Sequence, residues 1–187
     1  MRGPINVDSL RALPEILQRF TEAHQKNDVE AQRDILRQLI ERERVGYQRK
    51  LGLLAELKTL VQEARAAKEG DECVRRLVTA FKFAADLRAI GYDELDDQET
   101  GATANQAAYD TFKELEAMGP GDPVFIALLD DPSLAVRASA GALLLDRMPE
   151  RAIPVIEDIQ RTARGTDASI NAGFSLAMYR AEMTRRS

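Results

Sequence analysis

His24 and Cys73 are the one histidine and the one cysteine of the sequence, and side chains of these types often act as general bases and nucleophiles. His24 is expected in the last turn of a helix, where the helix dipole favours the imidazolium, and Cys73 in the first turn of another, where a thiol pKa can be lowered. One cysteine excludes an internal disulfide and a multi-cysteine metal site, and one histidine removes the usual zinc-hydrolase ligands. We therefore interpret His24 as a helix-end residue and Cys73 as a small, half-buried side chain.

The acidic stretch 93–99 suggests calcium, but its spacing does not fit an EF-hand loop. A loop that began at Asp93 would place Leu95 at the third ligand position, and a loop that began at Asp96 would place Ala107 where the bidentate glutamate belongs. The sequence also lacks a glycine-rich phosphate loop, a Gly-x-Ser-x-Gly elbow and a Ser-x-x-Lys pair. We expect a protein that is not an enzyme and that holds neither a metal nor a cofactor.

Charge is distributed unevenly along the chain. Residues 1–70 carry a net charge of +2 and residues 71–187 one of −7, and residues 89–136 hold eleven acidic residues against Lys113 alone. Such a segment repels nucleic acid and attracts a basic protein surface. The predicted contacts are Asp93, Glu94, Asp96, Asp97 and Glu99, with Asp110, Glu114 and Glu116 behind them.

Two less specific interpretations stay open for these charges. The acidic segment can be a solvated face on which Asp122, Asp130 and Asp131 cap helices. The basic cluster of residues 42–50 is interleaved with glutamates, so we expect pairing along one helix face to account for most of it. Arg137 is expected to bond carboxylates or carbonyls of the turn, such as those near Asp130 and Asp131.

Composition favours an all-α fold in a reducing, cytoplasmic setting. Of the 187 residues, 44% are apolar and 5% aromatic, and Ala, Leu, Glu and Arg dominate. No apolar run approaches the roughly 20 residues of a membrane span, and the first nine residues lack the apolar core of a signal peptide.

Helical spacing of apolar residues divides the chain into an N-terminal helical segment, 1–70, and a helical domain, 71–187. A first helix is expected over 8–26. Residues 28–68, with Asp28 as the N-cap, form either one long helix of about 60 Å or a hairpin that turns at Gly46, and the absence of turn residues favours one helix. Its stripe of Leu51, Leu54, Leu57 and Val61 is expected to be exposed and to pair with a second copy.

The second segment is expected to contain a helix over 71–91 that Asp71 caps, an acidic connection over 92–101, and a helix over 102–118. Four shorter helices that begin at Asp or Pro signals follow, at 124–129, 134–147, 149–164 and 169–183, the last one capped by Ser169. Short helices with tight turns make two hairpins that must stack to bury their apolar faces.

The run Leu-Leu-Asp-Asp-Pro-Ser at 128–133, followed by Ala-Val-Arg at 135–137, resembles a HEAT-type repeat. More closely, residues 74–183 resemble a bacterial family of HEAT-like helical proteins catalogued as a domain of unknown function, number two-thousand-nineteen of that series. The matching positions are turn and packing residues: Leu77, Val78, Phe81, Asn105, Tyr109, Asp110, 128–137, Pro149, Glu150, Arg151, Ala152, Val155, Glu157 and Ile159. Tyr179 stands where that family is expected to have Trp. The resemblance implies a helical-repeat fold and, because small acidic proteins of this kind recur as bacterial immunity proteins and antitoxins, favours that role.

Together these observations predict an all-α protein with a long N-terminal helix or helical hairpin followed by a short HEAT-like helical stack. The predicted function is a protein-binding module, an immunity protein or antitoxin that masks a basic toxin such as a nuclease through its acidic surface. The alternative is a structural adaptor or homo-oligomeric scaffold that uses the long N-terminal helix. A helical-repeat protein that binds nucleic acid would need a basic concave face, which the charge distribution disfavours.

Overall fold

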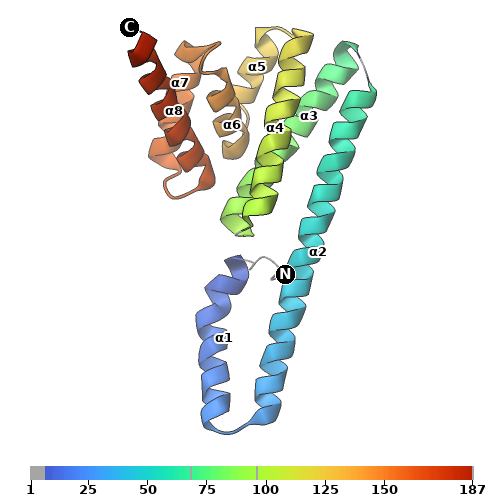
Figure 1. Cartoon of the computed structure of the whole chain (residues 1–187), viewed down its shortest axis with the longest axis vertical. Helices are drawn as coiled ribbons and strands as arrows, with labels where there is room; N and C mark the ends of the chain where they lie inside the picture. The colour runs from blue at the N-terminus through green and yellow to red at the C-terminus, as the bar shows by residue number, and fades with distance from the viewer. Residues whose placement is uncertain (1–6, 68, 96, 187) are drawn as a thin grey trace.

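The computed structural model describes residues 7–67, 69–95 and 97–186, and within these ranges all regular structure is helical, which confirms the predicted fold class (Figure 1). Along the chain the elements are α1 (Val7–Gln25), α2 (Val29–Ala66), α3 (Gly70–Ala89), the π-helical turn η1 (Ile90–Glu94), α4 (Gln98–Met118), α5 (Asp122–Leu129), α6 (Leu134–Leu144), α7 (Pro149–Thr162) and α8 (Asp167–Arg186). The α1–α2 hairpin projects from a helical stack formed by α3–α8 (Figure 1).

Residues 29–66 form a single helix of 38 residues, so the long-helix alternative is correct. As predicted, Asp28 is the N-cap: its Oδ1 accepts from the backbone N–H of Ala31 at 2.9 Å. The chain reverses direction at Asn27, which has φ of 55°, and α1 runs back beside the N-terminal half of α2 (Figure 1). The C-terminal half of α2 packs against α3 and α4.

The stripe predicted to be exposed on α2 lies largely against the protein's own core. Leu57 is buried, and Leu54 and Val61 are partly buried against the core of the helical stack; only Leu51 is half exposed. The prediction that this stripe is exposed is therefore wrong for three of its four residues, because the sequence could not show that α3 and α4 pack against α2.

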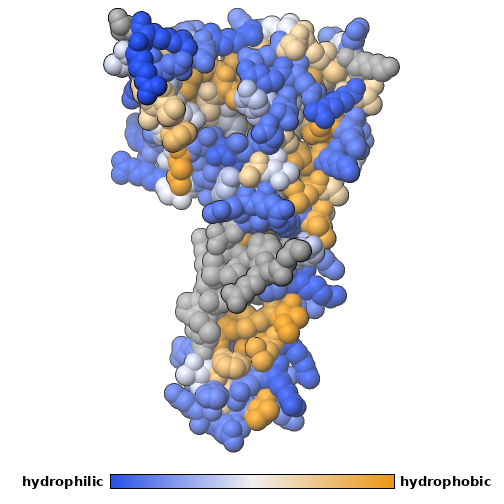
Figure 2. Space-filling model, in the orientation of Figure 1, coloured by the Kyte–Doolittle hydropathy of each residue, from blue (hydrophilic) through white to orange (hydrophobic). Residues whose placement is uncertain are grey.

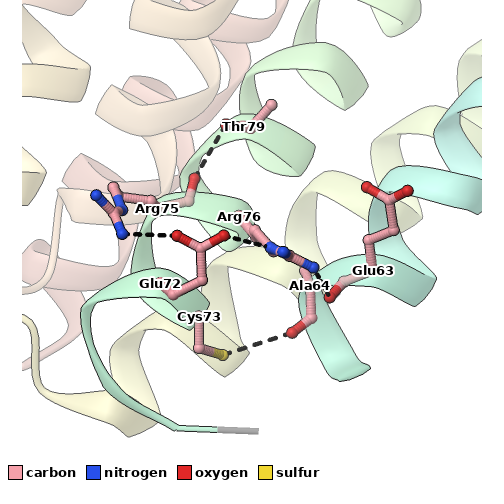
Figure 3. A network of polar contacts seen from close by, with 7 residues as sticks. All are labelled: Glu63, Ala64, Glu72, Cys73, Arg75, Arg76 and Thr79. Atoms are coloured by element: carbon pink, nitrogen blue, oxygen red, sulfur yellow. Dashed lines mark hydrogen bonds and ion pairs between the residues drawn. The ribbon is translucent and has the colours of Figure 1, made fainter. Parts of the chain in front are cut away.

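Polar contacts fasten the end of α2 to the start of α3 (Figure 3). Cys73 is buried, and its thiol donates to the carbonyl of Ala64 at 3.5 Å. Arg76 donates to the carbonyl of Glu63 at 3.3 Å and pairs with Glu72 at 2.7 Å. Because its thiol is buried and hydrogen-bonded to α2, Cys73 is a structural residue of this corner.

Asp71 was expected to cap α3, but it lies within the first turn of that helix.

The predicted acidic connection over 92–101 is mostly helical. The chain continues past α3 as η1, and α4 begins at Gln98 rather than at residue 102. Gly91 and Gly101 permit this, because the two backbones are in direct contact: a Cβ added to Gly91 would lie 2.7 Å from the backbone nitrogen of Gly101. A Cβ on Gly101 would lie 2.6 Å from the Tyr92 ring. Both positions therefore require glycine.

The helical stack is built from three helical hairpins, α3–α4, α5–α6 and α7–α8, around one core. Phe112 lies at its centre and contacts Phe81 and Phe125, with ring centroids 5.6 and 5.5 Å apart. Gly119 ends α4 in the left-handed conformation, with φ of 62°. α6 ends at Leu144, three residues earlier than expected.

Two side-chain roles in the helical stack differ from the prediction. Ser169 lies inside α8, and its backbone N–H donates to the hydroxyl of Thr166, which precedes the helix. Asp131 pairs with Lys82 of α3 at 2.6 Å instead of with Arg137, whose Nε is buried without a hydrogen-bond partner in the described part of the chain. The prediction paired the turn with Arg137, the nearest cation along the chain, whereas in the fold Lys82 of α3 lies next to Asp131.

Candidate functional site

Four of the eight acidic residues predicted as partner contacts pair with cations of α2. Glu94 pairs with Arg49 at 3.0 Å, and Glu114 pairs with Arg65 at 2.6 Å. Asp97 and Glu99 both pair with the ammonium group of Lys50, at 2.7 and 3.3 Å. These contacts form a polar seam, which we define as these four acids and their three cations, between α2 and the segment that runs from η1 through α4.

The basic cluster of α2 is therefore paired differently from the prediction. Arg44 does pair locally, with Glu41 at 2.7 Å, as expected for helix neighbours. Arg49 and Lys50 instead reach across to the helical stack. Of Arg42 only the backbone is described, so its pairing stays a prediction.

Lys50 and Asp97 form the buried centre of the seam, with 7% and 6% of their surfaces exposed. Burial alone would lower the pKa of Lys50, but hydrogen bonds and charge from Asp97 and Glu99 outweigh it and raise that pKa. Burial alone would raise the pKa of Asp97, but hydrogen bonds from Lys50 and Thr100 lower it. Both groups are thus charged and paired near pH 7, and Asp97 is inaccessible to a partner protein.

The other predicted contacts are dispersed. Asp93 is exposed and accepts from the backbone N–H of Asp167 at 2.8 Å. Asp110 accepts from Gln106 at 2.8 Å, and Glu116 pairs with Lys113 at 2.7 Å. Asp96 lies outside the described residues. The seven described acids therefore do not gather into one open acidic patch, and the role of the eight in binding stays a prediction.

A second region has the shape of a binding surface. Two hollows of about 530 Å³ each adjoin on the face formed by α4, α6 and α8, and they share Ala142, Phe174 and Ser175. We call this region the inner groove. The hollow nearer α4 is also lined by Arg88, Asn105, Gln106, Ala108, Tyr109, Ser139, Leu143 and Asn171. The hollow nearer the end of α8 is also lined by Leu145, Asp146, Met178, Tyr179, Ala181, Glu182, Arg185 and Arg186.

Large apolar side chains stand exposed along this groove. Phe174 is 68% exposed and Met178 56%, and Tyr109 is 47% exposed on the α4 side. Figure 2 shows apolar side chains along the visible face of α8. Leaving such side chains in water has a free-energy cost, and contiguous apolar patches of this kind usually mark an interaction surface.

Sequence reasoning missed the inner groove, although a signal was present. Leu176 and Ala172 form the buried face of α8, while Phe174 and Met178, four residues apart, form a second apolar face. A helix with apolar residues on two faces needs a partner for each face. The helical stack provides one partner, for the buried face.

Arg88 adds a polar feature to the groove. It is 9% exposed, its guanidinium pairs with Asp167 at 3.0 Å, and its Nε has no hydrogen-bond partner among the described residues. Burial raises the pKa of Asp167, the positive charge of Arg88 opposes this rise, and the negative charge of Asp93 adds to it. An unsatisfied buried donor costs about 1–3 kcal/mol, so the hydrogen bonding of this lining residue is incomplete among the described residues.

Other kinds of site find no support in the described residues. No group of three or more metal-ligating side chains occurs there, and none of the described helices has the length and apolarity to cross a membrane.

No protein-family model matches the sequence, and no curated protein or solved structure shows significant similarity to it. The resemblance to the HEAT-like family therefore stays a prediction.

Proposed function

We propose that this chain is a non-enzymatic protein-binding module and that its inner groove receives an apolar segment of a partner protein. The proposal rests on the exposure of Phe174, Met178 and Tyr109 around two adjoining hollows. Asn105 and Asn171 line the same groove and offer amide groups to the backbone of a bound segment. An apolar centre with a polar edge is the usual composition of a protein-binding surface.

The charge of the chain favours a basic partner. Residues 71–187 carry a net charge of −7, and some of the acids outside the polar seam, among them Asp93 and Asp146, are exposed. Charge of this sign speeds the encounter with a basic protein, whereas the apolar groove supplies the contacts that keep the complex together. A basic toxin masked by an immunity protein or antitoxin is the partner that we propose first.

The test is binding to the product of the neighbouring gene, expressed and purified, by isothermal titration calorimetry. Phe174→Ser removes the most exposed of the three large apolar side chains named for the groove, and we expect it to weaken binding at least tenfold. Val45→Ser is the matched control because Val45 is 56% exposed on α2, away from the groove. We expect it to bind like the parent.

Each outcome bears on the proposal. Both substitutions lie at exposed positions, so the melting temperature should stay close to that of the parent. If the parent binds and the Phe174→Ser variant binds equally well, the groove is not the docking surface. If the neighbouring gene's product does not bind, the immunity role is refuted as proposed.

A further inference from the structure

The hollow of the inner groove nearer α4 is lined by corresponding positions of three helices. α4, α6 and α8 are the second helices of the three hairpins, and α6 lies between the other two (Figure 1). Nine of the lining residues form three sets in which the positions on α4 and α6 are 34 residues apart and those on α6 and α8 are 32 apart. These sets are Asn105, Ser139 and Asn171; Ala108, Ala142 and Phe174; and Tyr109, Leu143 and Ser175.

The first of these sets, which we call the polar row, has hydrogen-bonding groups that the protein itself does not use. Within the described part of the chain, the side chains of Asn105, Ser139 and Asn171 have no hydrogen-bond partner. Ser139 is only 6% exposed. The described polar side-chain atoms that are sealed from solvent without a partner are the Nε atoms of Arg88 and Arg137, so the hydroxyl of Ser139 is open to the hollow. Buried polar groups are normally hydrogen-bonded, so the partner of this hydroxyl is water or a bound molecule.

The charge of this hollow suits an uncharged occupant. Arg88 is the one charged residue that lines it, and the guanidinium group already pairs with Asp167 at 3.0 Å. An ionic ligand would therefore find no free opposite charge there, and burial of an unpaired charge is costly. The amides and hydroxyls of the polar row are neutral, and each side chain can both donate and accept a hydrogen bond.

A polypeptide in an extended conformation matches these neutral groups, whereas a helix does not. A bound helix uses its own N–H and C=O groups in internal hydrogen bonds, so it would leave the polar row unpaired. An extended segment presents a free donor and a free acceptor at each residue other than proline. Side chains that both donate and accept, such as those of Asn105 and Asn171, can bond both groups of such a backbone.

The dimensions of the groove agree with an extended segment. Packed helices lie about 8–10 Å apart, so the axes of α4 and α8 are separated by roughly 16–20 Å across α6. An extended chain advances about 3.3 Å per residue, so about six residues reach from Asn105 to Asn171. The short side chains of Ala108 and Ala142 leave room for a backbone between the helices, and Phe174 is exposed for apolar contacts.

We propose that the inner groove binds an uncharged segment of a partner protein in an extended conformation, which crosses α4, α6 and α8 and bonds the polar row through its backbone. This inference rests on the function proposed above and adds the conformation of the bound segment and the groups that recognise it. Backbone hydrogen bonds contribute affinity for such a segment, and the apolar contacts beside Phe174 select its side chains.

The test uses a capped, uncharged peptide, acetyl-Ala-Leu-Ala-Leu-Ala-methylamide, titrated into the nitrogen-15-labelled full chain and followed by NMR. A peptide of this length does not form a stable helix. The side-chain amide signals of Asn105 and Asn171 should shift and saturate with a dissociation constant of roughly 1 mM. An analogue in which esters replace the two central amides keeps the side chains but loses two backbone donors, and we expect it to bind at least fivefold more weakly.

Variants of the polar row test the same contacts from the side of the protein. Asn105→Ala/Asn171→Ala removes both amides, and the shift of the Phe174 backbone signal should then require at least fivefold more peptide. Gln62→Ala is the matched control, because Gln62 is an exposed amide on α2 away from the inner groove. Its affinity for the peptide should equal that of the parent. Melting temperatures close to that of the parent show that the variants fold.

The possible failures of this inference differ from those of the proposed function. If the ester analogue and the double variant bind as well as the parent pair, while Phe174→Ser weakens binding, the groove accepts apolar groups without bonding a backbone, and only the present inference is wrong. It is also wrong if a peptide of the same composition held helical by a side-chain link binds more tightly than the linear one. Absence of shifts in the groove up to about 20 mM peptide overturns it as well, whereas calorimetry with the neighbouring gene's product decides the proposed function.

Discussion

The α1–α2 hairpin and the helical stack differ in how completely they bury their apolar residues. In the helical stack, side chains as large as Phe81, Phe112 and Phe125 have no exposed surface. In the hairpin, the described buried apolar residues are few and small or medium in size, such as Ala23 and Ile35, while Ile40 and Tyr47 are exposed. The helical stack therefore has a hydrophobic core of its own. The hairpin buries few apolar side chains apart from those on the face of α2 that packs against the stack.

One helix belongs to both regions, which explains the contrast. The second half of α2 buries Leu57 and Ala64 against the helical stack. Its first half extends beyond the stack and lies beside α1 (Figure 1). Near the point where the two halves meet lies the buried centre of the polar seam, Lys50 and Asp97. The seam orients the hairpin on the stack by charge and hydrogen bonding, and this leaves apolar surface of the hairpin available for association.

The largest effect we expect comes from breaking the seam at its buried centre. Lys50→Met leaves the Asp97 carboxylate buried without its cation, and removal of one partner from a buried pair costs about 3–5 kcal/mol. Chemical denaturation of the parent and the variant measures this loss of unfolding free energy.

The double variant Lys50→Met/Asp97→Leu is the matched control. It removes both charges, so most of the lost stability should return. Arg49→Ala is a second control, because Arg49 and Glu94 are half exposed and such pairs contribute about 0–1 kcal/mol. If Lys50→Met costs no more than Arg49→Ala, the seam does not hold the two regions together.

Two glycine substitutions, one in the helical stack and one on α2, are expected to change the stability of the protein by smaller amounts. Gly91→Ala places a methyl group 2.7 Å from the backbone of Gly101, and relieving that overlap should cost about 1–3 kcal/mol. Gly52→Ala on α2 meets nothing within 4 Å and should stabilise the helix by roughly 1 kcal/mol. The melting temperatures of the two variants should therefore move in opposite directions. A stable Gly91→Ala variant would contradict the close contact of η1 with α4.

Local patterns were sufficient to predict most of the fold. The long helix α2 followed from the absence of turn residues between residues 45 and 49, and the cap at Asp28 followed from a side chain that bonds its own chain three residues on. The start of α4 could not be predicted in this way. Gly101 and Gly91 look like breakers along the chain, but they are helical or π-helical residues where two backbones meet.

The candidate site was harder to predict, because a sequence gives the charge of each residue but not the place of that residue in the folded protein. The acidic run 93–99 and the cations Arg49 and Lys50 are separated by more than forty residues, so only the fold shows that they neutralise each other. The apolar residues of the inner groove are likewise distributed over α4, α6 and α8. Phe174 and Met178 carried a local signal as a second apolar face of α8, whereas Arg88 carried none.

The smallest effect concerns pH and compares two buried carboxyls, Asp97 in the seam and Asp167 in the helical stack. The pKa of Asp97 is lowered below its usual 3.8, so its contribution to stability is present above that value and is lost as the pH falls through the folded-state pKa. The pKa of Asp167 is raised above 3.8, so the folded state holds a proton more tightly than the unfolded state, and stability is lost as the pH rises through the folded-state pKa. Melting temperatures of the parent and of the Asp97→Asn and Asp167→Asn variants, measured from pH 3 to 7, should therefore give difference curves of opposite slope. The advantage of the parent over Asp97→Asn should grow as the pH rises, and its advantage over Asp167→Asn should shrink. If both curves slope the same way, one of the two carboxyls is not in the environment described, and Asp167, which pairs with Arg88 beneath the inner groove, is the first to re-examine.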